Sequence, residues 1–334
     1  MKYLAASLGL ALLAGATTPA LANDKWDRLP WSDTQPLTLR AGYNTVMQYP
    51  HARAIERFSH RVAERTGEVL RIQTFPSETL GSERQMLEGV IAGNIDMAKV
   101  STGVVTSFMP EFGIFDLPYV FRSVEHMMQV INGPIGKKLA DALEQRNVKI
   151  LFWMEQGTRS VYTTSKPIKS IDDLKGLKIR TIQSPIMADT ITALGARPTP
   201  MPFGELYLGL KSGVVDGAEN APDSLWYSKQ YEVAKHYTLT NHFMTPVVFV
   251  INKSKFDGLP PAMKEILIAT AAETQEWAST LYSTVAADLL GKMKTAGVNV
   301  YTVDEAPFRK AAATVIEKHA GRFAEVLQQI EATK

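Results

Sequence analysis

The chain has 334 residues, of which 45% are hydrophobic and 21% charged, and its formal net charge is +2. This length allows two domains, and the nearly neutral charge argues against a nucleic-acid-binding protein, which would carry a basic stripe. The chain contains no cysteine. It therefore forms no disulfide and offers no cysteine for the attachment of a lipid.

The N-terminus has the pattern of a secretory signal peptide. Residues 1–22 combine Lys2, an apolar run over residues 4–16 and the small-residue ending Ala20-Leu21-Ala22, which predicts cleavage before Asn23. No other stretch approaches the roughly 18 apolar residues of a spanning helix, so we expect a soluble mature protein with no stable membrane insertion. A cysteine-free exported chain must be stabilised by a large core, and free diffusion after export suits the periplasm.

Alternating strands and helices are predicted along the first half of the mature chain. Strands are short apolar runs, and each helix stops at a glycine. The pattern predicts strands at 37–41, 69–72, 95–98 and 150–154 and helices at 51–66, 82–93 and, split at Gly133-Pro134, 123–145. The aromatic segment 112–121 should be buried. The strand at 150–154 leads to Gly157-Thr158-Arg159, where we expect the chain to cross between two lobes.

Residues 175–220 are expected to form a strand, a helix, a strand, a helix and a strand. The first strand ends at Arg180, and Ser184 caps a helix with proline at its first position. The pattern then predicts extended chain at 197–201, a helix at 203–212 and a strand at 214–216. In an open α/β sheet, ligands bind outside the carboxyl ends of the strands, where Arg180, Phe203 and Asn220 would converge.

An internal similarity relates the two halves of the chain. Residues 87–98 align with residues 207–218 without a gap, and two glycines, an aspartate and an alanine coincide. Two helix–glycine–strand units, one in each half, predict two α/β lobes of like construction. The alternative is that this junction is simply common.

The C-terminal part completes the expected architecture. A strand at 247–251 would return to the first lobe, a long helix at 260–291 would span both lobes, and a helix at 307–330 would cover the surface. We therefore expect an α/β fold of the periplasmic-binding-protein type, with two lobes joined by crossing strands and a long spanning helix. The expected limits are 37–156 and about 245–285 for lobe 1, 157–244 and about 286–305 for lobe 2, and 306–334 for the C-terminal helix.

Motifs of common enzymes are absent from the sequence. HExxH, GxSxG, GxxxxGK[ST] and GxGxxG do not occur, and the six histidines lack close metal-ligand spacing. We therefore expect no catalytic residue, no metal and no cofactor.

The strongest candidate site residue is Arg180, because the rigid fork of arginine can hold a carboxylate through two parallel hydrogen bonds. An internal ion pair or a solvated side chain is equally consistent with the pattern, and Arg159 has the same alternatives. Phe203 could belong to the core or contact a ligand. The amide of Asn220 can both donate and accept, which suits a hydroxylated ligand.

Several motifs together resemble one family. The first half contains GSERQM, AGNIDMA, FDLPYVF and EQGTRSVYTTSKPI, and the second half contains LKGLKIR, PTPMPFGELYLGLKSGVVDGAEN and YEVAKHYTLTNH. In this order, over about residues 37–316, they resemble the DctP-type substrate-binding component of TRAP (tripartite ATP-independent periplasmic) transporters. The resemblance implies a two-lobed protein that closes on an organic anion and hands it to a membrane permease driven by an ion gradient.

The resemblance also assigns roles to individual residues. Arg180 matches the arginine that clamps the ligand carboxylate, and Arg159 matches a second arginine of the cleft. The remaining implied ligand-binding residues are Asn220 and Phe203 in the cleft, Asn44, Glu83 and Gln183, which would read hydroxyl groups, and Glu219 beside Asn220. Lys99 falls where sialic-acid-binding members have an acidic residue, so a sialic acid is not expected. Lys99 would pair with Glu83 or with a second ligand charge.

The expected ligand is a small hydroxylated monocarboxylate such as a uronate or an aldonate, bound by a protein that is a monomer. C4-dicarboxylates and other organic acids are the alternative ligands. A secreted enzyme acting on acidic sugars is a different possibility, with Glu83, Asp216 or Glu219 as acid and base. A periplasmic sensor subunit, which presents the ligand to a membrane receptor, would share the same fold and cleft.

Overall fold

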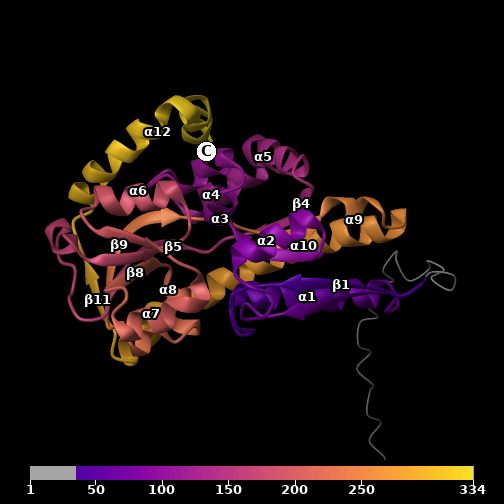
Figure 1. Ribbon diagram of the computed structural model, residues 1–334, viewed down its shortest axis with the longest axis horizontal. Helices are drawn as coiled ribbons and strands as arrows, with labels where there is room; N and C mark the ends of the chain where they lie inside the picture. The colour runs from indigo at the N-terminus through magenta and orange to yellow at the C-terminus, as the bar shows by residue number, and fades with distance from the viewer. Residues whose placement is uncertain (1–34, 334) are drawn as a thin grey trace, which may run out of the picture.

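Two sheets organise the molecule (Figure 1). The computed structural model describes residues 35–333, so the predicted signal peptide at residues 1–22 lies outside the described residues. The first sheet contains β1 (Leu37–Gly42), β2 (Leu70–Phe75), β3 (Met97–Ser101), β4 (Val148–Met154) and β10 (Val247–Asn252), in the order β2-β1-β3-β10-β4. The second contains β5 (Thr158–Thr163), β6 (Lys178–Thr181), β7 (Arg197–Pro200), β8 (Gly217–Asn220), β9 (His236–Met244) and β11 (Asn299–Thr302), in the order β11-β9-β5-β8-β6-β7. We call the parts built on these sheets the first and second lobes, and the prediction of a two-lobed α/β fold is confirmed.

Helices cover both faces of each sheet. In the first lobe, α1 (Pro50–Arg65) and α10 (Pro261–Ala286) pack on one face, and α2 (Glu83–Ala92), α4 (Val124–Asn132) and α5 (Pro134–Glu144) pack on the other. In the second lobe, α7 (Leu206–Ser212), α8 (Pro222–Tyr227) and α11 (Leu289–Thr295) share one apolar cluster, and α6 (Pro185–Ala193) and α12 (Ala306–Ala332) share another. The short elements are α3 (Thr102–Val105), α9 (Lys253–Asp257) and the 3₁₀ helices η1 (Pro110–Asp116), η2 (Ile171–Leu174), η3 (Phe203–Glu205) and η4 (Gln230–Glu232). Among residues 35–333, no helix is both long and apolar enough to cross a bilayer.

Besides the junction between α10 of the first lobe and α11 of the second, the chain crosses between the lobes at two neighbouring strand connections. β4 of the first lobe continues into β5 of the second, and β9 of the second lobe continues into β10 of the first. Met154 pairs with Val247 on one side of the crossing, and Thr158 pairs with Met244 on the other. The two connections are therefore limited to residues 155–157 and 245–246.

The two helix–glycine–strand units occupy equivalent places in the two lobes. Gly93 follows α2 and Gly213 follows α7, both in the left-handed conformation, with φ values of 80° and 75°. The Asp96 carboxylate accepts a hydrogen bond from the Arg40 backbone N–H at 2.6 Å, and Asp216 accepts one from the Lys178 N–H at 2.8 Å. Each aspartate thus ties its loop to the neighbouring parallel strand, which explains the shared sequence pattern.

Two expected strands begin later than predicted. Strands were expected at 95–98 and 214–216, but β3 starts at Met97 and β8 at Gly217. The backbone N–H of Ile95 donates to Gly89 at 3.1 Å, and that of Val215 donates to Gly209 at 3.2 Å. These apolar residues therefore close the end of the preceding helix instead of joining the sheet.

The expected long helix at 260–291 is interrupted. α10 ends at Ala286 and α11 begins at Leu289, and Asp288 between them has φ −116° and ψ 1°, outside the α-helical region. Aspartate competes for backbone hydrogen bonds and is unfavourable inside helices. α10 alone still reaches the crossing, where the Tyr282 hydroxyl donates to the carbonyl oxygen of Gln156 at 2.8 Å.

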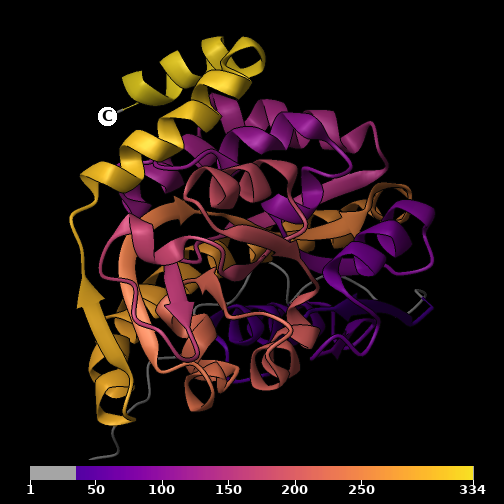
Figure 2. The same ribbon diagram turned by 60° about the vertical axis from the view of Figure 1, so that its left-hand side comes forward.

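The C-terminal helix α12 lies along the outside of the molecule in both views (Figure 1, Figure 2). On the second lobe, Lys318 forms an ion pair with Asp189 of α6 at 2.8 Å. Near its other end, the carbonyl oxygen of Ile330 is 3.0 Å from Nε2 of His126 in α4. α12 therefore contacts helices that cover both sheets.

A pair of glycine substitutions tests the helix packing. A Cβ atom on Gly136 of α5 would lie 1.8 Å from the carbonyl oxygen of Ile131, whereas nothing lies within 4 Å of a Cβ on Gly321 of α12. We expect Gly136→Ala to lower the free energy of unfolding by about 1–3 kcal/mol through overpacking. Gly321→Ala should raise it by about 0.5–1 kcal/mol, because alanine favours the helix. Urea denaturation of both variants measures the difference, and equal effects would contradict this packing.

Candidate binding site between the lobes

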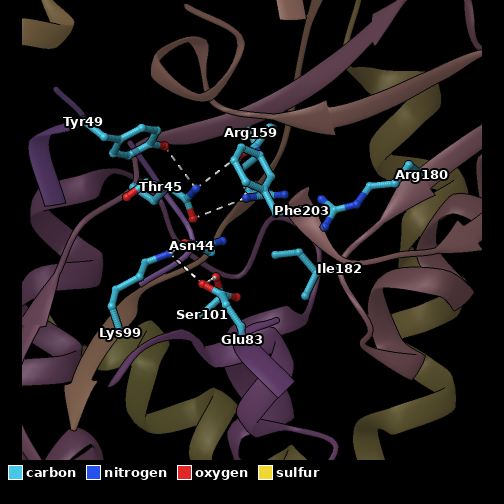
Figure 3. A pocket seen from close by; sticks show the side chains of 12 residues that line it. Asn44, Thr45, Tyr49, Glu83, Lys99, Ser101, Arg159, Arg180, Ile182 and Phe203 are labelled. Atoms are coloured by element: carbon cyan, nitrogen blue, oxygen red, sulfur yellow. Dashed lines mark hydrogen bonds and ion pairs between the residues drawn. The ribbon is translucent and has the colours of Figure 1, made fainter. Parts of the chain in front are cut away.

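A small cavity of about 20 Å³ lies between the lobes, close to the crossing (Figure 3). It opens at the carboxyl ends of the parallel strands β1, β3, β6 and β8, where open α/β sheets bind ligands. Its lining consists of Asn44, Thr45, Tyr49, Glu83, Lys99 and Ser101 from the first lobe and Gln156, Arg159, Arg180, Ile182, Phe203 and Asn220 from the crossing and the second lobe. A volume of about 20 Å³ is close to what one water molecule needs, so the lobes leave little free space between them in this structure.

Six of the eight expected ligand-binding residues line this cavity: Arg180, Arg159, Asn220, Phe203, Glu83 and Asn44. Gln183 lines a smaller hollow of about 10 Å³ that shares Glu83, Arg180, Ile182 and Phe203 with the main cavity. Glu219 lies behind the lining, where it contacts Arg159.

Arg180 lies at the end of β6 with only 3% of its surface exposed. Its Nε and Nη2 donate to the carbonyl oxygen of Met201 at 3.0 and 2.7 Å, whereas its Nη1 has no hydrogen-bond partner within residues 35–333. The ring of Phe203 lies 5.9 Å from the guanidinium carbon, and Figure 3 shows the two side chains facing each other. Burial lowers the pKa of Arg180 below its usual range, although the Glu219 charge opposes this. An anion entering the cavity would supply the missing partner.

Arg159 differs from Arg180 because its charge is already paired. Its Nε and Nη2 donate to the two carboxylate oxygens of Glu219 at 2.7 and 2.9 Å, and its Nη1 donates to Oδ1 of Asn220 at 2.7 Å. Both members of the ion pair are fully buried. Burial alone would lower the pKa of Arg159, but the Glu219 charge raises it above the usual value. Of the alternatives left open by the sequence, the internal ion pair is the one observed.

The first lobe contributes a second buried ion pair. Nζ of Lys99 donates to Oε1 of Glu83 at 2.7 Å and to Oδ1 of Asn44 at 3.0 Å, and the Ser101 hydroxyl donates to the same Glu83 oxygen at 3.2 Å. Lys99 therefore faces Glu83, one of the two arrangements expected for it. Figure 3 shows this group across the cavity from Arg180. This group offers hydrogen-bond donors and acceptors to the cavity but carries no net charge.

No role was predicted for five of the lining residues: Thr45, Tyr49, Ser101, Gln156 and Ile182. Nε2 of Gln156 donates to Oδ1 of Asn220 and to the Ser224 hydroxyl, both at 3.3 Å, and the Tyr49 and Ser224 hydroxyls are 2.7 Å apart. This network joins the first lobe to the second through the crossing. The only sequence signal for it is the position of Gln156 directly before Gly157.

The three carboxylates proposed for an enzyme do not assemble into one site. Only Glu83 lines the cavity, while Glu219 is paired with Arg159 and Asp216 accepts the hydrogen bond from the Lys178 backbone. In the part of the chain that the structure describes, no three His, Asp or Glu side chains are grouped so that they could hold a metal ion.

Comparison with known proteins gives consistent matches along the chain. Residues 41–322 match the family DctP, described as bacterial extracellular solute-binding protein, family 7. The chain is 36% identical, over 265 residues, to the 2,3-diketo-L-gulonate-binding periplasmic protein YiaO of Escherichia coli, covering 79% of this chain and 81% of that protein.

Solved structures of TRAP and sugar-acid-binding proteins are also similar. One is a TRAP periplasmic solute-binding protein from Pseudomonas putida F1 with bound D-glucuronate (TM-score 0.86, 33% identity, 89% of this chain and 98% of that chain). Another is the sugar-acid-binding protein DctPAm from Advenella mimigardefordensis in complex with galactonate (TM-score 0.87, 31% identity, 90% of this chain and 100% of that chain).

The Arg159 ion pair can be tested by removing one partner. Glu219→Ala should lower the free energy of unfolding by about 3–5 kcal/mol, because it leaves a buried positive charge uncompensated. Asp172→Ala is the control, since it breaks an ion pair with Lys175 in which both side chains are 74% exposed and should change stability by less than about 1 kcal/mol. Chemical denaturation compares the two variants. A loss for Glu219→Ala no larger than the control's would show that this pair contributes little.

Proposed function

The chain belongs to the DctP family of bacterial extracellular solute-binding proteins, family 7, and from this premise we propose that it captures a small organic acid anion in the periplasm and delivers it to a TRAP membrane permease. The proposed ligand is a sugar acid, either a uronate or an aldonate. Relatives named or solved with 2,3-diketo-L-gulonate, D-glucuronate and galactonate support this class. Each of these ligands carries one carboxylate and several oxygen functions.

The charges of the cavity are the observation that carries the proposal. The Arg159 and Lys99 charges are paired with Glu219 and Glu83, whereas no Asp or Glu of residues 35–333 lies within ion-pair distance of Arg180. The lining therefore has one cation left for one ligand carboxylate. A second carboxylate would be buried without a cation of its own, which is costly. This charge balance favours a monocarboxylate over a C4-dicarboxylate.

Hydroxyl groups of the ligand would meet polar partners on both lobes. Asn44, Glu83 and Lys99 line the first lobe, and Gln156 and Asn220 line the opposite side. Because buried hydroxyls lose their water, each one needs such a donor or acceptor. We propose that these residues form hydrogen bonds with the ligand hydroxyls and that Arg180 binds the ligand carboxylate.

Binding is proposed to proceed by closure of the lobes. We assign lobe 1 to residues 37–156 and about 245–285, and lobe 2 to residues 157–244 and about 286–305, with bending at the two strand connections and at the junction between α10 and α11. A ligand held by Arg180 on one side and by the Glu83 group on the other contacts both lobes only in the closed form. Such contacts shift the population toward that form.

A ligand panel tests the proposal. Purified mature protein, starting at Asn23, would be heated with D-glucuronate, D-galacturonate, D-galactonate, succinate and, as uncharged matched controls, D-glucose and D-galactose. A ligand at about a thousand times its Kd adds roughly 4 kcal/mol to stability, so a bound sugar acid should raise Tm by several degrees. We expect a response to sugar acids and none to the neutral sugars. A response to succinate alone would refute the monocarboxylate assignment, and silence with every acid would refute the function. Unaltered recovery of the bound acid separates binding from turnover.

Replacing Arg180 tests the carboxylate site. Arg180→Ala should weaken binding of the responding acid by at least about a hundredfold, because it removes the only unpaired cation of the lining. Arg197→Ala is the matched control, since it removes an exposed arginine from the neighbouring strand β7. Calorimetry gives both values of Kd, and circular dichroism checks the fold. An unchanged Kd for Arg180→Ala in a folded protein would contradict the site assignment.

A further inference from the structure

A carboxylate of the first lobe reaches the backbone of the second lobe at the rim of the cavity. Glu78, in the turn after β2, accepts a hydrogen bond from the Gly204 N–H at 3.1 Å. Gly204 belongs to η3, the 3₁₀ turn between β7 and α7. Glu78 is not among the lining residues, so the proposed ligand contacts do not account for its position.

The turn that carries Glu78 is anchored to the cavity wall. Ser77 and Glu78 have φ values of 55° and 58°, a left-handed conformation that is uncommon for residues with a side chain. Their backbone N–H groups donate to the carbonyl oxygens of Thr45 and Tyr43 at 3.0 and 3.1 Å, on both sides of Asn44. The carboxylate is thus held at a fixed place relative to the ligand-binding face of the first lobe.

Gly204 allows this approach because it has no side chain. A Cβ atom on Gly204 would lie 2.2 Å from Oε2 of Glu78. The backbone of Gly204 is not in the left-handed region, so its conformation alone would allow alanine. The residue before it is Phe203, whose ring lies over the Arg180 guanidinium. The hydrogen bond therefore holds η3 against the first lobe. This turn carries the Phe203 ring that lies over Arg180.

The charged groups around Glu78 are Glu83, Arg180 and Glu205. Burial raises the pKa of the Glu78 carboxyl above its usual value, and the Gly204 N–H and the Arg180 charge counter this rise. A partly buried carboxylate with two other acidic groups nearby is unfavourable without a donor. Gly204 supplies that donor from the opposite lobe.

We propose that Glu78 is a positioning residue that latches the closed cleft through the Gly204 N–H without touching the ligand. The inference rests on the proposed function, because it requires lobes that close on a ligand. Glu78 and Gly204 lie on different lobes, so opening separates them and the bond stabilises only the closed form. Its effect should therefore appear mainly in the rate at which a bound ligand dissociates.

A double-mutant cycle tests the latch, with D-glucuronate as the probe, or whichever sugar acid of the panel binds. Glu78→Ala should raise Kd by about three- to tenfold, a modest factor because the bond lies at the solvent-exposed rim. Gly204→Ala should have a similar effect, since its methyl group displaces the carboxylate. The double variant should be no weaker than either single one, because each change breaks the same contact. Glu78→Gln keeps an acceptor oxygen and should give a smaller change.

Controls and outcomes separate the latch from the ligand site. Glu205→Ala removes an exposed carboxylate next to Gly204 and should leave Kd within about twofold. Stopped-flow measurements should show that the ligand dissociates faster from the Glu78 and Gly204 variants than from the wild-type protein. If the wild-type protein binds a sugar acid but Glu78→Ala binds it equally well, or if the two single effects add, the latch is refuted and the proposed function stands. If the wild-type protein binds no acid, both are refuted.

Discussion

Two neighbouring strand connections between the lobes set the position of the cavity. β4 and β10 pair up to Met154 and Val247, and β5 and β9 pair again from Thr158 and Met244. Only five residues separate these paired regions, counting residues 155–157 and 245–246 together. The cavity lies beside this short junction, with Gln156 and Arg159 in its lining. Because the cavity lies beside these connections, its polar residues lie between the two sheets, and their spacing depends on how the sheets are placed relative to each other.

Two of the three cations that line the cavity are paired with carboxylates, and the third, Arg180, is not. Removing a charge from water is costly, and the protein offsets this cost internally for Arg159 and Lys99 through Glu219 and Glu83. Arg180 receives only a backbone carbonyl oxygen at two of its three nitrogens. Under the proposed function, an anion would complete the coordination of Arg180, whereas a neutral sugar would not. Selectivity for the charge of the ligand would then follow from which buried cation lacks an acidic partner.

Features determined by neighbouring residues could be predicted from the sequence, and features determined by distant packing could not. The Ser184 cap, the glycines after α2 and α7 and the two-lobed fold depend on local signals or on the repeated pattern, and the family resemblance is confirmed. The sequence pattern did not predict β9, in which the buried residues Thr238, Thr240 and His242 alternate along one face and interrupt the apolar pattern. The pairing of Arg159 with Glu219 was left open for another reason. It depends on the register of β5 against β8, which no local pattern encodes.

The strand order of the first sheet also controls how the protein can fold. β10 lies between β3 and β4, although it follows both in the chain by about a hundred residues or more, and the whole second sheet except β11 is encoded before it. Until Val247–Asn252 has been synthesised, the two halves of the first sheet have unpaired edges facing each other. Contacts between residues so far apart in sequence make folding slow. Neither lobe is therefore encoded by one continuous segment: the first sheet is completed only by β10 and the second only by β11.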